Sequence, residues 1–299
     1  MKRKFEIVFF DKLNTELEKL WIELERETNI GFFQTCIWQK YWSNQCLNNK
    51  TIFFVCIFED KKLIAILPLN IRKIFYVKVL NWNGFPFSDY NSPIIKNSIS
   101  LSNNDYRTIF LEIKKNFSFD VIHLINNIDP LFLNNRNFKN NKSYRLKIFD
   151  DQSYHLIFNK LRKKIFYEEN RLKKKHKLEI LLDPNKEQKK QITEFFILQK
   201  YHQLERTGGW NYLKYDNYKS YISNLIKLDE NSISYSMLKL DNKIIACHIG
   251  YIYRNTFFYI FPVYNESFKK FSPGNILFLK LIEYCKEKKF DYLDLTIGD

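Results

Sequence analysis

Glycine is scarce in this chain, with only seven in 299 residues, so each one is a candidate for a backbone position that other residues cannot fill. Histidine is scattered and no two cysteines have C-x-x-C spacing, which argues against a metal centre or a redox motif. An odd set of cysteines also argues against a disulfide framework and favours buried thiols in a reducing compartment. These cysteines are Cys36, Cys46, Cys56, Cys247 and Cys285.

Long apolar runs are also missing. No stretch reaches the roughly 20 unbroken apolar residues that a membrane-spanning helix needs. The N-terminus begins with basic residues, but Glu6 interrupts the apolar segment that follows and Asp11 ends it, which is too soon for a signal peptide. We therefore expect the protein in the cytoplasm.

Positive charge is in excess, with 48 Lys and Arg against 33 Asp and Glu and a net charge of +15. A net charge this positive is typical of proteins that bind nucleic acid, an anionic membrane surface or phosphorylated substrates. It can also result from codons biased towards A and T, which favour Lys, Asn, Ile and Phe throughout the chain. The charge concentrates in residues 160–177, which include Arg162. This segment is either a solvated helix face or a cationic rim that guides CoA, a nucleotide sugar or tRNA.

The chain contains a faint internal repeat. Residues 59–65 return as 240–246 and residues 111–124 return as 282–295, in the same order and with offsets of 181 and 171. This order predicts two copies of one domain, at residues 1–150 and 151–299. A single large domain with a coincidental repeat is the alternative, because both matching stretches are short.

Each copy has the same expected plan of helices, an antiparallel meander, then a helix and a strand, which is an α+β fold. In the first copy we expect helices at 11–26, 35–47 and 105–116 and strands at 52–58, 63–71 and 119–125. In the second copy we expect helices at 186–206 and 273–289 and strands at 232–240, 243–253, 256–263 and 291–296.

The strongest chemical motif is Phe-Ser-Pro-Gly-Asn at residues 271–275. Ser272 is a natural N-cap and Pro273 a natural first helical residue, so the motif explains a helix start by itself. Gly274 at the same place would also let a phosphate approach the free N–H groups of the helix, and Lys269 and Lys270 precede it.

The chain resembles tandem GNAT acyltransferases, namely the CelD-like acetyltransferases of bacterial polysaccharide loci and the Fem-type aminoacyltransferases. The resemblance implies two GNAT-like lobes, each a mixed, mainly antiparallel sheet flanked by helices. The residues that carry it are 33–38, 67–69, 87–90, 161–164 with Arg171, His202 with Arg206, Ile245 with Ala246, 272–274 and 293–299.

That resemblance implies transfer of an acyl group from acyl-CoA, most simply acetyl-CoA, to the amine of an amino sugar, a nucleotide sugar or a related envelope precursor, without a metal. Transfer from aminoacyl-tRNA is the alternative, and a non-catalytic binding protein on a decayed GNAT fold is a third. Relatives generally continue beyond the Gly-Asp found here at 298–299, so the segment after it is dispensable, or the chain is truncated or inactive.

The implied roles fall into three groups. The carrier phosphates are assigned to Lys269, Lys270, Ser272, Gly274 and Asn275, with backbone N–H groups of strand 256–263 as oxyanion donors. Asp89, His202, Glu205 and Asp294 are candidates for proton removal, and Tyr259 or Tyr264 for protonating the thiolate. Substrate contacts are assigned to Phe87, Tyr90, Arg162, Arg206, Trp210 and Tyr259. The first copy has Asn-Ser-Pro-Ile-Ile at 91–95 where the second has its glycine motif, so the first lobe is expected to face the acceptor. Structural roles remain open for each: a helical His is often a packing residue, and the chain has nineteen tyrosines.

Overall fold

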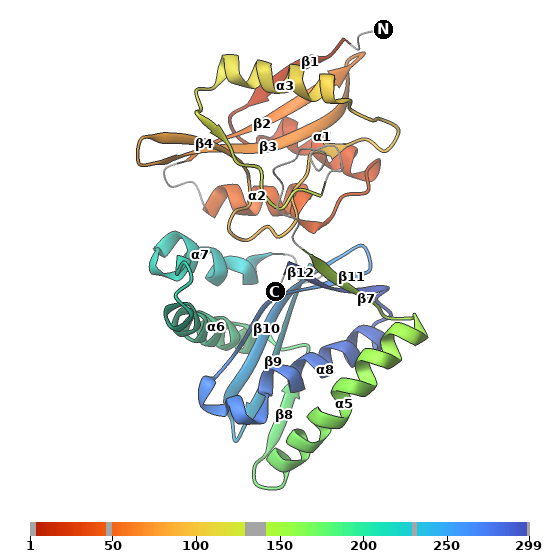
Figure 1. The fold of residues 1–299 in the computed structure, drawn as a ribbon, viewed down its shortest axis with the longest axis vertical. Coiled ribbons are helices and arrows are strands. Elements are labelled where there is room, and N and C mark those ends of the chain that lie inside the picture. The colour runs from red at the N-terminus through yellow and green to blue at the C-terminus, as the bar shows by residue number, and fades with distance from the viewer. Residues whose placement is uncertain (1–3, 46–49, 129–141, 229–231, 298–299) are drawn as a thin grey trace. The chain divides into compact units, whose positions relative to one another are not determined.

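The computed structural model describes residues 4–45, 50–128, 142–228 and 232–297. The chain divides into two compact units, Met1–Asn141 and Lys142–Asp299 (Figure 1). The division lies nine residues before the boundary expected from the sequence. Strand β7 (Ser143–Lys147) explains the difference, because it pairs antiparallel with a strand near the C-terminus and so belongs to unit 2.

Unit 1 is a sheet in the order β1-β2-β3-β4-β6, with β5 added to β3. Neighbouring residues of a strand point to opposite faces. Accordingly, Phe53 and Val55 enter the core cluster beneath α3, while the ring of Phe54 meets Trp21 of α1 at 5.5 Å. The strands are β1 Glu6–Phe10, β2 Lys50–Glu59, β3 Lys62–Ile74, β4 Val77–Trp82, β5 Ile94–Ile95 and β6 Val121–Ile122; the helices are α1 Thr15–Arg26, α2 Cys36–Gln45 and α3 Asn103–Asn116, with the 3₁₀ turn Phe32–Gln34.

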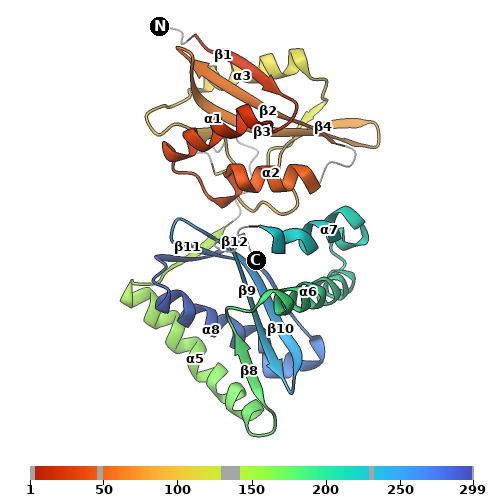
Figure 2. The ribbon, with the colours of Figure 1, turned by 180° about the vertical axis from the view of Figure 1, so that it is seen from behind.

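Unit 2 is a sheet in the order β7-β12-β11-β10-β9-β8. Helices α5 and α8 cover one face and α6 covers the other (Figures 1 and 2). The strands are β8 Leu178–Leu181, β9 Ile233–Leu240, β10 Lys243–Tyr253, β11 Thr256–Tyr264 and β12 Tyr292–Ile297; the helices are α5 Asp151–Lys173, α6 Lys186–Thr207, α7 Asp216–Asn224 and α8 Pro273–Glu287, with 3₁₀ turns at Tyr212–Lys214, Leu225–Lys227 and Glu266–Phe271.

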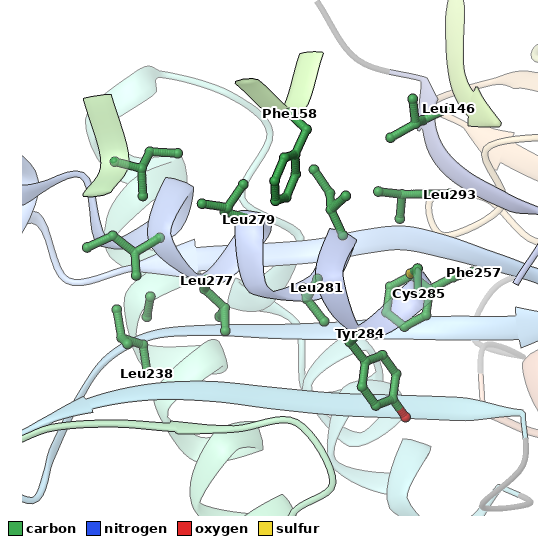
Figure 3. Close-up of a cluster of buried hydrophobic side chains, with 14 of the residues drawn as sticks. Leu146, Phe158, Leu238, Phe257, Leu277, Leu279, Leu281, Tyr284, Cys285 and Leu293 are labelled. Atoms are coloured by element: carbon green, nitrogen blue, oxygen red, sulfur yellow. The ribbon is translucent and has the colours of Figure 1, made fainter. Parts of the chain in front are cut away.

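The core of unit 2 lies between the sheet and the pair α5 and α8 (Figure 3). Helix α8 contributes Leu277 and Leu281, α5 contributes Phe158, and the sheet contributes Leu238 and Leu293, all of them buried. Burying each such side chain stabilises the fold by about 1.5–3 kcal/mol. This packing fixes the start of α8 relative to β11 and β12, which matters for the site below.

The internal repeat is confirmed in three dimensions. Residues 59–65 and 240–246 both form a hairpin turn whose two central residues have positive φ, Asp60 and Lys61 in one and Asp241 and Asn242 in the other. The second matched pair of segments forms α3 with β6 in unit 1 and α8 with β12 in unit 2. In each unit the strand after this helix pairs in parallel with the last strand of the antiparallel meander. In unit 1 this is β6 with β4, and in unit 2 it is β12 with β11.

The expected helices and strands appear within a few residues, except that 119–125 forms a strand only at Val121–Ile122. The basic segment 160–177 is helical to Lys173, and its side chains Arg162, Lys163 and Arg171 are exposed. Four cysteines are free and buried, and Cys46 lies outside the described residues, as do Gly298 and Asp299. In the described part of the chain no helix is long and apolar enough to cross a membrane, and no three His, Cys, Asp or Glu side chains gather as metal ligands would.

Candidate active site

Strands β11 and β12 part in the middle of the unit 2 sheet. They pair in parallel only from Thr256↔Tyr292 to Phe258↔Asp294, although β11 runs on to Tyr264. The register between β12 and β7 shifts after Asp294, and the two strands pair again at Ile297↔Ser143. Among the described residues, β11 therefore makes no ladder of hydrogen bonds with β12 beyond Phe258. This leaves backbone groups of β11 facing an opening in the sheet.

A β-bulge lies at the same place. The antiparallel register of β10 and β11 shifts between Ile249↔Phe261 and Tyr251↔Phe258, so Tyr259 and Ile260 together oppose the single residue Gly250. A bulge re-aims backbone N–H groups and side chains. Because the bulge directly follows the last β11–β12 pair, it lies beside the opening in the sheet.

Helix α8 begins close to the end of β11 and has an open N-terminus. Ser272 precedes it with φ of 50° and makes no side-chain capping hydrogen bond, and Pro273 is the first helical residue. The N–H groups of Asn275 and Ile276 donate to the Ser272 carbonyl. Because Pro273 has no N–H and no side chain caps this end, the N–H of Gly274 and the helix dipole are what favour an anion here.

Gly274 lies in this first turn without positive φ. A Cβ placed on it would lie 3.5 Å from Cδ1 of Tyr264, which is an ordinary contact. Neither backbone strain nor lack of space for a methyl group accounts for this glycine. Its effect is to leave the helix start uncovered beside the Tyr264 ring.

Four cations surround the turn before α8. Lys269 and Arg206 both pair with Glu266, at 3.2 and 2.9 Å. Lys270 and Arg171 lie over the ring of Phe271, at 5.1 and 4.9 Å from its centroid. Arg171 comes from α5, so the C-terminal end of the basic helix reaches the start of α8. All four side chains are exposed, which leaves them able to turn toward a phosphate.

A small pocket joins several of the residues proposed from the sequence. It has a volume of about 30 Å³, enough for one water-sized group. His202, Arg206 and Tyr264 line it, together with Gln199, Gln203, Val263 and Glu266. His202 itself is exposed and meets the ring of Tyr201 edge-on at 5.9 Å. Since Tyr264 also contacts the Gly274 position, the structure brings His202, Arg206, Tyr264 and the start of α8 together.

Asp294 lies at the parting of the strands but its carboxylate already has partners. It is 1% exposed and accepts hydrogen bonds from Nε of Arg145 at 3.0 Å and from the N–H of Thr296 at 2.8 Å. Nη2 of Arg145 adds an ion pair at 2.9 Å. The carboxylate thus holds the irregular end of β12 against β7, a role that favours structure over proton transfer.

Tyr259 lies in the bulge and stacks on a histidine that sequence reasoning missed. The rings of Tyr259 and His248 are 4.3 Å apart and inclined by 7°, and Phe278 of α8 meets Tyr259 at 5.0 Å. His248 is fully buried, and burial lowers its pKa to about 3. Burial raises the pKa of the Tyr259 hydroxyl. A polar residue inside the apolar strand at 244–252 was the available signal.

The remaining candidates lie in separate surroundings. Phe87 is 3% exposed and therefore part of the unit 1 core, while Asp89 and Tyr90 are partly exposed. Gln34 donates to the Tyr90 carbonyl at 2.6 Å and the Trp38 indole donates to Ser88 at 2.9 Å, which fixes this loop within unit 1. Three further candidates lie in unit 2. Trp210 clusters with Tyr212, Tyr215 and Tyr218, and Arg162 lies over the Phe158 ring. Glu205 accepts a hydrogen bond from Asn211 and forms an ion pair with Lys214.

Comparison with known proteins places this geometry in context. Residues 159–299 match the family model described as an acetyltransferase (GNAT) domain. A comparison with curated proteins finds no match.

Solved structures match almost the whole chain at low sequence identity. FemX has a TM-score of 0.62 at 11% identity, covering 98% of this chain and 89% of FemX. A tandem GNAT protein from the clavulanic acid biosynthesis pathway has a TM-score of 0.56 at 8% identity, covering 97% and 89%. A protein of unknown function from Bacteroides thetaiotaomicron has a TM-score of 0.55 at 12% identity, covering 98% and 90%. At such identities these likenesses establish the fold.

Proposed function

For this tandem GNAT-fold chain, whose residues 159–299 match the acetyltransferase domain model, we propose an N-acyltransferase that works in the cytoplasm. It moves an acyl group from acyl-CoA to the amine of an amino sugar or a related envelope precursor. The observation that carries the proposal is the parting of β11 and β12 at a bulge, next to the open N-terminus of α8. CoA would supply a thioester whose carbonyl carbon the amine attacks.

The described residues fit such a carrier in unit 2. The pyrophosphate is assigned to the first turn of α8 at Gly274 and Asn275, with Lys269, Lys270 and Arg171 as exposed cations around it. The thioester oxygen is assigned to backbone N–H groups at the bulge, where hydrogen bonds strengthen as negative charge develops. Tyr264 is the proposed proton donor to the thiolate because it ends the bulge strand β11 and its ring lies beside Gly274 at the helix start.

The proton of the attacking ammonium is assigned to His202. It lines the small pocket with Tyr264, and the neutral imidazole of a histidine has a ring nitrogen that can accept a proton. Asp89 remains a proposed acceptor contact from unit 1, together with Tyr90. Phe87 is better suited to support that loop from the core. We assign Arg206 and Trp210 to the acceptor side of unit 2.

The test is carrier binding. Acetyl-CoA should raise the melting temperature of the wild-type protein, and Gly274→Glu should abolish the rise, because a carboxylate then occupies the helix start. Ser220→Glu is the matched control, since it adds the same charge at an exposed position of α7. Stabilisation of the Gly274→Glu variant equal to that of the control would contradict the assignment of the phosphate site.

Transfer from aminoacyl-tRNA is the second candidate, favoured by one observation. The outer face of α5 carries Lys163, Arg171 and Lys173 beside Phe166 and Tyr167, which are 57% and 66% exposed. Basic residues interleaved with exposed aromatics suit RNA backbone and bases. A tRNA complex that weakens steeply with salt, in a protein that no CoA ester stabilises, would promote this function over the first.

A further inference from the structure

Three buried polar atoms without partners lie together behind the bulge. Among the described residues, Nδ1 and Nε2 of His248 and Oγ of Ser236 make no hydrogen bond, and both residues are 0% exposed. Ser236 of β9 is the direct cross-strand partner of His248 in β10. Side chains of directly opposed residues leave the sheet on the same face, so these atoms share one interior site.

The backbone makes room for this imidazole. A Cβ at Gly250 would lie 2.5 Å from Cε1 of His248 and 2.6 Å from the carbonyl oxygen of Phe258. Any larger residue at 250 would displace the ring or the bulge strand. One of the chain's seven glycines is therefore used where the histidine ring and the bulge meet.

The surroundings define what the site can bind. His248 stacks on Tyr259 and contacts Phe257, and its low pKa means that the imidazole is neutral with one donor and one acceptor nitrogen. The Ser236 hydroxyl adds a donor and an acceptor. The three atoms carry no charge to balance an ammonium or a carboxylate, and burial of an unpaired charge is strongly unfavourable. A neutral hydroxyl, which donates once and accepts twice, suits the three atoms.

Location connects the site with the donor of the proposed reaction. Tyr259 lies in the bulge to which the thioester oxygen is assigned, and His248 lies directly against its ring. We infer that Ser236 and His248 form an acyl-selective pocket that receives the hydroxyl of a short hydroxyacyl group carried on CoA. The inference rests on the proposed function. Because both side chains have no exposed surface, the acyl chain reaches them only when the Tyr259 ring turns away from the imidazole.

The experiment compares two CoA esters of equal chain length, 3-hydroxybutyryl-CoA and butyryl-CoA, by isothermal titration calorimetry. Wild-type protein should bind the hydroxy ester about tenfold more tightly, the scale of one well-formed hydrogen bond to a buried group. Ser236→Ala and His248→Phe should each reduce the ratio to about one. Ser43→Ala is the matched control, because Ser43 is a buried serine that belongs to α2 of unit 1 and takes no part in the unit 2 site.

A second measurement follows the His248 ring itself. In protein labelled with ¹⁵N-histidine, the ring resonances of His248, assigned by their loss in His248→Phe, should shift with the hydroxy ester and stay unchanged with butyryl-CoA. Equal affinities for both esters, with unchanged ring resonances, would mean that the pocket holds water alone and would overturn the inference while leaving acyl-CoA binding intact. Binding of neither ester would instead overturn the proposed function on which the inference rests.

Discussion

The neutral, buried His248 makes a specific prediction about stability in acid. Burial lowers its pKa from 6.5 to about 3 in the folded protein. Below pH 6.5 the unfolded chain therefore binds a proton that the folded chain does not, and stability falls as the pH drops through the window from 6.5 toward 3. Above pH 6.5 both states are neutral at this residue and its contribution to stability is fully present.

The magnitude follows from linkage. Each pH unit inside the window changes the free energy of unfolding by about 1.4 kcal/mol, so between pH 7 and pH 5 His248 alone should account for a loss of about 2 kcal/mol. In a unit of this size that corresponds to a fall in melting temperature of roughly 4–8 °C. His248→Phe removes the titrating group and also removes two polar atoms without partners, so it should be at least as stable as the wild type at pH 7.

The assay is urea unfolding of wild-type and His248→Phe protein at pH 7 and pH 5. The difference between the two proteins should grow by about 2 kcal/mol on going to pH 5. The other four histidines are common to both proteins and cancel in this comparison. An acid loss of equal size in both proteins would show that His248 is hydrated or already protonated in the fold, and would refute its description as a neutral buried group.

Two further substitutions separate structure from chemistry. Asp294→Asn should lower the free energy of unfolding by about 1.5–3 kcal/mol, because the charge-assisted bonds from Arg145 are lost. Calorimetric unfolding checks this. Unchanged stability with a turnover loss of about 10²-fold would instead identify Asp294 as a proton acceptor. His202→Gln should leave the melting temperature unchanged because His202 is exposed. The rate of acyl transfer, measured by the release of the CoA thiol, should fall by about 10²-fold. Full activity of that variant would remove His202 from the proposed mechanism.

Local patterns in the sequence predict much of the fold. Strand-forming residues on both sides of the Asp241-Asn242 turn predict the β9–β10 hairpin, and Ser272 with Pro273 predicts the start of α8, because both signals depend on residues close in sequence. The repeat extends these local predictions to two units that share one order of five strands, β1-β2-β3-β4-β6 in unit 1 and β8-β9-β10-β11-β12 in unit 2.

The site itself depends on contacts that local patterns do not encode. The parting of β11 and β12 is set by pairing between residues such as Phe258 and Asp294, and the Arg145 partner of Asp294 is 149 residues away. Aromatic composition likewise does not distinguish a buried Phe87 from an exposed one, since tertiary packing decides it. The partnerless state of His248 appears only when its strand neighbours and the ring stacked on it are known.

The two helix starts related by the repeat differ in a way that predicts one carrier site per chain. The sequence comparison set residues 91–95 against the glycine motif, but this alignment is wrong, because α3 begins at Asn103 after the N-cap Ser102. Ser102 and Asp105 close that end with a reciprocal capping box, and the Asp105 carboxylate lies where a phosphate would have to bind.

At the start of α8 the corresponding Ser272 makes no capping bond, and no acidic residue lies in the first turn. An anion is therefore repelled at α3 and favoured at α8. Calorimetry with acetyl-CoA should give one site per chain, removed by Gly274→Glu and unaffected by Asp105→Asn. Two equivalent sites, or a single site that survives Gly274→Glu, would show that the open end of α8 is not what selects the carrier.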